Sequence, residues 1–325
     1  MKSETVPEAT PATAYGADTI ITRKELKPFV QRTDRHALTH FIVHMAALGG
    51  TGYLVFLSLG SWWIVPAMGL HAFIMVNIYS PIHEGSHGTP YRARWLNEAV
   101  YWFLSLIYVQ TPIYFRYRHA AHHTHTMIRG GDPDFSLPEN ARIMDYVWYV
   151  STIPFWMRNG EWLLRHACGR IHPDDHYFIP ADEFPRIHRE ARVILALYGA
   201  IAAVAIYFGS WAPILYWLLP RVIGEPFRRW NNIGEHTGLK EDGNLVTNTR
   251  TTLTFRPLAF LMWNMNYHAE HHISTLVPYH ALPKLHAYLK GQMAYETGLL
   301  NVHGAILRGL AAGRTDTTIN QVPAE

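Results

Sequence analysis

Long apolar runs alternate with polar segments along the chain. One run covers 38–59 and the next covers 62–82, with only a Gly-Ser pair between them. A second pair of runs, 191–208 and 211–224, is also separated by a Gly-Ser pair. A helix needs about 20 apolar residues, at about 1.5 Å of rise each, to cross the hydrocarbon core of a bilayer. The pattern therefore predicts an all-α integral membrane protein with four transmembrane helices, arranged as two hairpins.

Arginines in the polar segments indicate which side of the membrane these segments occupy. Residues 83–190 contain eleven Arg, whereas the breaks inside the two hairpins contain no Lys or Arg. By the positive-inside rule, this segment and both termini lie in the cytoplasm. We expect an integral protein of a bacterial inner membrane with a membrane domain at 23–290. Its cytosolic cap would be formed by 83–190 and 225–290, between an N-terminal tail (1–22) and a C-terminal tail (291–325).

Two further apolar stretches are expected at the membrane surface rather than across the bilayer. Residues 95–115 contain two amides and a carboxylate and carry basic residues at both ends. This composition favours an interfacial or cavity-lining helix. Residues 146–157 are too short to span and are interrupted by a proline.

The composition is unusual in its ratio of histidine to cysteine, the two side chains that most often bind transition metals. The 325 residues include 21 His and a single Cys. One Cys excludes a disulfide framework, a Cys-based zinc site and an intrinsic iron–sulfur cluster. The net charge of +3 does not indicate a nucleic-acid partner.

The histidines of the predicted cap cluster in three boxes. In sequence order these are His83-Glu-Gly-Ser-His87, His119-Ala-Ala-His122-His123 and His268-Ala-Glu-His271-His272. Residues three and four apart share a helix face, while adjacent side chains diverge by about 100°. Adjacent imidazoles therefore suit two neighbouring metals better than one. Eight box histidines, together with His236 after the fourth run, exceed the three or four ligands of a single zinc site.

Other interpretations of these histidines remain open. His83-Glu84-x-x-His87 also matches the zinc-protease pattern in which Glu is the general base, although a single-zinc protease needs no further boxes. A non-catalytic metal-binding or metal-transport protein would place polar ligands inside the spans. We expect His125, beside the second box, not to be a ligand. We expect the same of the other closely spaced histidines, which are His36, His40, His44, His172 and His176.

The three boxes, placed after the first predicted hairpin, before the second and near the C-terminus, resemble those of the membrane fatty acid desaturase and hydroxylase superfamily. The run from Asn266 to His272, followed by Leu282-Pro-Lys-Leu285, is similar to the third-box region of front-end and sphingolipid-type desaturases. Gly131-Asp-Pro-Asp134 also looks like a segment of some members. Asn232-x-x-x-His236 resembles the additional ligand motif of the family.

The resemblance implies a di-iron enzyme with two Fe²⁺ ions, O2 as co-substrate and an unactivated C–H bond as its target. The substrate would be a fatty acyl lipid or, alternatively, a small non-acyl molecule. Carried over by position, the iron ligands are His83, His87, His119, His122, His123, His236, His268, His271 and His272. We assign catalytic roles to Glu84, Asn232 and Glu270, and Asn232 would act through water or from the outer shell. Carboxylates that could orient ligand rings are Glu84, Asp132, Asp134, Glu235 and Glu270.

The electrons for such chemistry must come from another protein. The chain has no GxGxxG dinucleotide motif after a strand and no cysteines for a cluster. A ferredoxin, a b-type cytochrome or a reductase would therefore dock on the cap. Basic residues suited to steer an acidic donor are Arg92, Arg94, Arg116, Arg118 and Arg129.

Overall fold

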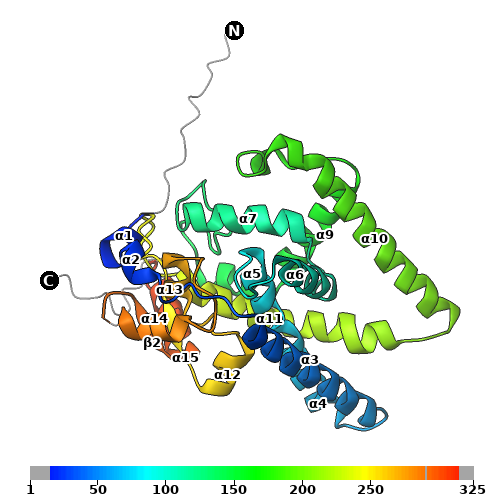
Figure 1. The fold of residues 1–325 in the computed structure, drawn as a ribbon. Coiled ribbons are helices and arrows are strands. Elements are labelled where there is room, and N and C mark those ends of the chain that lie inside the picture. The colour runs from blue at the N-terminus through cyan, green and yellow to red at the C-terminus, as the bar shows by residue number, and fades with distance from the viewer. Residues whose placement is uncertain (1–14, 290, 315–325) are drawn as a thin grey trace.

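Helices form most of the structure (Figure 1). The computed structural model describes residues 15–289 and 291–314. Two short helices come first, α1 (Ala17–Ile20) and α2 (Arg23–Leu26). The long helices that follow along the chain are α3 (Asp34–Leu57), α4 (Ile64–Val76), α10 (Phe184–Tyr207) and α11 (Leu219–His236).

Three helical stretches of the described chain are long and apolar enough to cross a membrane. They are Asp34–Leu57, Ile64–Ser86 and Ala181–Tyr207. Large apolar side chains at their far ends face outward, and Trp62 is 91% exposed while Tyr207 is 82% exposed. Such exposure is costly in water and is expected where lipid surrounds the protein. The chain therefore has the features of an integral membrane protein.

The helices of the first predicted hairpin, α3 and α4, pack together, and α11 packs beside them. Helices α3 and α4 lie against each other and α4 also packs along α11 (Figure 1). Gly224 of α11 makes this approach possible, because a Cβ atom there would lie 2.5 Å from the carbonyl oxygen of Ala72 on α4. Glycine thus sets the close contact between these two helices.

The second predicted hairpin differs from expectation. Its first arm is α10, which packs mainly on α9, whereas the second arm packs on α4. Within 211–224, Ile214–Leu218 forms a π-helical turn, η3, and α11 then continues with the buried charges Arg221 and Glu225. The described residues contain three candidate spans, and 211–224 is not among them, so that a fourth spanning helix is not confirmed.

The cap between the long helices is built from shorter ones. The expected single helix at 95–115 is two, because Val109 adopts a left-handed backbone conformation (φ 62°) and ends the first of them. The helices and 3-10 turns of this part are α5 (Tyr79–Ser86), α6 (Arg94–Tyr108), α7 (Pro112–His125), α8 (Ile143–Val150), α9 (Ile153–Ala167), η1 (Pro173–Asp175) and η2 (Ala181–Glu183).

The C-terminal part completes the cap. Its two strands pair in parallel, with Thr251 opposite Tyr295. The segment expected as a tail after residue 290 instead contains a strand and a helix that packs against α11. Its elements are β1 (Thr251–Leu253), α12 (Arg256–Leu261), α13 (His268–Ile273), α14 (Leu282–Tyr288), β2 (Tyr295–Thr297) and α15 (Leu299–Ala311).

Candidate metal centre

Nine histidines from four separate segments converge inside the cap. They come from α5 and the residue after it, from α7, from the last residue of α11, and from α13. They form two groups, and within each group the possible ligand nitrogens lie within 4.8 Å of one another. The first group is His83, His87, His119, His123 and His271, and the second is His122, His236, His268 and His272. These are the nine positions that the sequence pattern singled out.

The spacing of the ring nitrogens suits metal ions. In the first group, the Nε2 atom of His123 lies 3.1 Å from that of His119 and 3.2 Å from that of His271. In the second, the Nε2 atom of His268 lies 3.2 Å from that of His236 and 3.1 Å from that of His272. Two nitrogens bound to one ion at about 2.1 Å lie about 3.0 to 3.4 Å apart. The donor set therefore fits two metal ions.

Neighbouring histidines of a box point to different groups. His122 belongs to the second group, whereas His123, one residue later on α7, belongs to the first. His271 and His272 on α13 divide in the same way. This division follows from the rotation of about 100° per residue on a helix.

Polar partners behind the rings fix their orientation. The Nδ1 atom of His122 donates to Asp132 Oδ1 at 2.9 Å. The Nδ1 atom of His236 lies 3.2 Å from the carbonyl oxygen of Asn248, and that of His272 lies 3.2 Å from the Thr126 hydroxyl. Partners of this kind hold ligand rings and set their tautomers.

The pair of Asp132 and His122 is also coupled electrostatically. Burial lowers the pKa of His122, but the Asp132 carboxylate outweighs burial, so that the pKa is raised. In the same way, burial raises the pKa of Asp132 but His122 and two backbone N–H groups lower it below its ordinary value. The Asp132 carboxylate therefore stays ionised near neutral pH and keeps its hold on the ring.

Glu84 and Glu270 stand behind the histidines rather than among them. Glu84 is fully buried and accepts hydrogen bonds from the Thr89 hydroxyl at 2.8 Å and the Tyr279 backbone N–H at 3.0 Å. Its Oε2 atom lies 3.8 Å from the outer nitrogen of His271. Glu270 bonds to the Thr251 hydroxyl and to His286 Nδ1. These contacts are those of positioning groups.

Asn232 belongs to a polar network beside the second group. Its amide nitrogen donates to Glu235 Oε2 at 3.0 Å, and its oxygen accepts from the Tyr149 hydroxyl. The same Glu235 oxygen lies 3.7 Å from His268 Nε2. Burial raises the pKa of Glu235, partly offset by Arg228 and Asn232. The network therefore places a carboxylate with a raised pKa next to the second group.

The histidines expected not to be ligands lie outside both groups. His40 and His44 join helices instead: their Nε2 atoms lie 2.8 Å from the Phe260 carbonyl oxygen and 3.1 Å from that of Ile74. His125 lies near the Tyr177 ring. His172 and His176 flank the η1 turn, and His36 lies beside the His280 ring.

Several residues of the site have no motif that reveals them in the sequence. Tyr149 reaches Asn232, and Thr126 reaches His272, only because the chain folds back over 83 and 146 positions. Asn248 lies twelve residues after His236, whose ring it contacts. Arg228 differs from these residues because a sequence motif lies near it: it precedes Asn232-x-x-x-His236 on the same helix.

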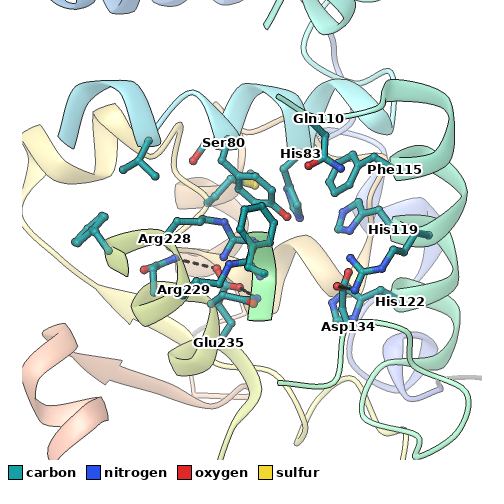
Figure 2. Close-up of a pocket in the computed structure, with 18 of the residues that line it drawn as sticks. Ser80, His83, Gln110, Phe115, His119, His122, Asp134, Arg228, Arg229 and Glu235 are labelled. Atoms are coloured by element: carbon teal, nitrogen blue, oxygen red, sulfur yellow. Dashed lines mark hydrogen bonds and ion pairs between the residues drawn. The ribbon is translucent and has the colours of Figure 1, made fainter. Parts of the chain in front are cut away.

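A pocket opens beside the two groups. Figure 2 shows α7 presenting His119 and His122 on one side, opposite Arg228, Arg229 and Glu235. The rest of the lining is mixed: it contains polar and charged side chains together with the aromatic residues Tyr79, Phe115, Tyr149, Phe155, Trp162 and Phe227. A small molecule or part of a larger one could therefore approach the histidines from this side.

The predicted basic docking surface is partly neutralised by carboxylates. Arg116 pairs with Glu98 at 2.9 Å, and Arg129 pairs with Glu241 at 2.6 Å. Arg118 pairs with Asp134 and lines the pocket instead of the outer surface.

Apolar helices long enough to cross a bilayer and two buried histidine groups together define a membrane protein with a candidate two-metal centre. Residues 60–302, well over half of the chain, match the family described as fatty acid desaturase, and the chain belongs to that family. The resemblance seen in the histidine boxes is thereby confirmed.

A curated relative is the sphingolipid delta(4)-desaturase DES1 of Drosophila melanogaster. It is 23% identical over 229 residues, which cover 69% of this chain. The aligned part spans 65% of that relative's own length, slightly less than two thirds.

Replacing Asp132 by Asn is expected to weaken metal binding by the second group. The amide cannot carry the negative charge that holds the His122 ring, and loss of such a partner typically lowers metal affinity about 10- to 100-fold. Competition titration with a chromophoric chelator measures the affinity. Asp174→Asn is the matched control, because it removes a carboxylate from the exposed His172 pair. Parental affinity in Asp132→Asn would contradict the positioning role.

Proposed function

We propose that the protein is a membrane-bound, O2-dependent di-iron oxidoreductase that desaturates or hydroxylates an unactivated C–H bond. The observation that carries this proposal is the convergence of nine histidines into two groups within a desaturase-family chain. Imidazole nitrogens are good ligands for iron. When bound, two Fe²⁺ ions would supply O2 activation and removal of hydrogen from the substrate.

The proposed reactions balance with an external source of electrons. Hydroxylation places one oxygen atom of O2 in the C–H bond and releases the other as water, using two electrons and two protons. Desaturation removes two hydrogens and, with the same electrons and protons, releases two waters. A ferredoxin, a b-type cytochrome or a reductase is proposed as the donor, acting on the cytoplasmic side of a bacterial inner membrane.

The protein's own residues would hold the metals, orient them and restrict water. The two histidine groups would each hold one ion, and Asp132, Glu84 and the Asn248 carbonyl would fix rings from behind. Because both histidine groups are buried, water and substrate would reach them from the side on which the pocket opens. Glu235, which accepts a hydrogen bond from Asn232, would act as a hydrogen-bond acceptor beside the second group.

The zinc-protease alternative receives little support from the placement of Glu84. Its carboxylate accepts from Thr89 and Tyr279 and stands behind His271, so it is not directed toward a metal-bound water. The proposed substrate remains a fatty acyl lipid or a small non-acyl molecule.

Metal analysis and product analysis test this proposal. The purified full chain is expected to contain about two irons per chain, and removing iron with a chelator should abolish oxidation until Fe²⁺ is restored. Incubation with a ferredoxin–reductase pair, O2 and a lipid or metabolite extract, followed by mass spectrometry, identifies the product. Less than about one iron per chain, with zinc in its place, would falsify the proposal.

A further inference from the structure

One wall of the pocket carries a buried arginine, Arg228, that forms no ion pair among the described residues, although the Glu235 carboxylate acts on it electrostatically. Arg228 lies on α11, about two turns before His236, and is only 8% exposed. Its Nε and Nη1 atoms are buried and have no hydrogen-bond partner among the described residues. Its guanidinium carbon lies 3.6 Å from the centre of the Tyr79 ring, so the cation rests on an aromatic face.

The other arginines that line the pocket are already neutralised or solvated. Arg118 pairs with Asp134, and the Nε atom of Arg229 donates to Glu225 at 2.6 Å. Arg158 is exposed. The remaining pocket carboxylate, Glu235, accepts from the amides of Asn231 and Asn232, and the described structure contains no ion pair between it and Arg228.

A buried guanidinium with free donors is unfavourable unless a ligand satisfies them. Contact with Tyr79 compensates part of the lost hydration of Arg228 but leaves the Nε and Nη1 atoms without a partner among the described residues. An alkyl chain against these groups would keep them unpaired, whereas a carboxylate oxygen accepts a charge-assisted hydrogen bond from a guanidinium N–H. The chemistry of this wall therefore selects an oxyanion.

We infer that the substrate is an organic acid whose carboxylate binds Arg228 inside the pocket. This inference rests on the proposed function, because it names the class of molecule that the oxidation would act on. Aromatic side chains, including Phe115, Phe155 and Trp162, line part of the pocket and suit an apolar body for this acid.

The location of Arg228 also limits which carbon is oxidised. Tyr79, the ring on which the guanidinium rests, lies 5.8 Å from the His83 imidazole, centre to centre. Figure 2 shows Arg228 and His83 facing the same pocket. A molecule anchored at Arg228 would thus present a C–H bond close to its own carboxylate, not one at the far end of a long acyl chain.

Binding of matched acids and amides tests the inference without turnover. Octanoate and octanamide share one carbon skeleton, and their affinities for the iron-loaded full chain in neutral detergent are measured by calorimetry. Octanoate is expected to bind at least about tenfold more tightly, as a charge-assisted pair requires. Arg228→Gln should remove this preference, while Arg186→Gln, which removes an exposed arginine paired with Glu183, should retain it.

Two further measurements complete the binding test. Arg228→Lys keeps the charge without the fork and should retain part of the preference, which also covers the case that Arg228→Gln does not fold. Hexadecanoate distinguishes the source of the carboxylate: it binds more tightly than octanoate if the acid is a free fatty acid, and more weakly if the acid is small.

The outcomes separate this inference from the proposed function. Absence of octanoate binding, equal binding of octanoate and octanamide, or an unchanged preference in Arg228→Gln overturns the inference even when two irons are present. A chain that lacks iron but prefers octanoate through Arg228 contradicts the proposed function and supports the anion site.

Discussion

The variant His268→Ala is expected to bind one metal ion per chain instead of two, and to lose product formation by at least about a thousandfold. The Nε2 atom of His268 lies within 3.2 Å of those of both His236 and His272, so this ring is central to the second group. Its removal leaves three histidines around a gap on the side that faces the pocket.

Metal content and activity are both measured for this variant, because the two should fall together. His176→Ala is the control, since His176 is exposed and lies outside both groups. A His268→Ala protein that keeps two irons and forms product at the parental rate would show that the second group is not a functional metal site.

Replacing Glu225 by Gln is expected to destabilise the protein by about 3 to 5 kcal/mol. The Glu225 carboxylate is fully buried and bonds to Arg221, to Arg229 and to the Tyr108 hydroxyl. Arg221 is itself fully buried, so the amide would leave its charge uncompensated. Denaturant-induced unfolding in detergent measures the loss.

An exposed pair of the same chemistry provides the comparison. Glu241→Gln removes the partner of Arg129, where both side chains are 31% exposed, and should cost at most about 1 kcal/mol. Equal losses in the two variants would refute a special role for the buried pair.

The difference between Glu225→Gln and the parent should also depend on pH. Burial raises the pKa of Glu225, but Arg221 and Arg229 outweigh burial and lower it below the ordinary 4.5. A carboxylate with a lowered folded-state pKa stabilises above its unfolded pKa and loses this contribution as pH falls through the folded value. The gap between the two proteins should therefore be full near pH 7 and shrink below about pH 4.5.

Local spacing explains why the histidine groups could be anticipated from the sequence. The boxes lie on short helices, where separations of three and four residues determine which rings share a face. The division of His122 from His123 follows from the same geometry. Assignment of these residues as iron ligands stays a prediction, which metal analysis addresses.

Features that depend on contacts between distant segments could not be anticipated. The run 211–224 looks like a spanning segment, because one-dimensional hydropathy does not show that Arg221 finds Glu225 and a buried environment. The left-handed conformation of Val109 has no glycine to signal it, although Pro112 does indicate that a new helix begins nearby. The link from Tyr149 to Asn232, 83 positions apart, likewise exists only in the folded chain.

The division of each box between the two groups has a consequence for biosynthesis. The first group takes only His271 from α13, whereas the second takes both His268 and His272 from it. Before residue 272 is translated and α13 has docked, the second group therefore has only His122 and His236. We expect nascent chains stalled before this point to lack a tightly held metal at the second group, so that filling of this group is one of the last steps of maturation.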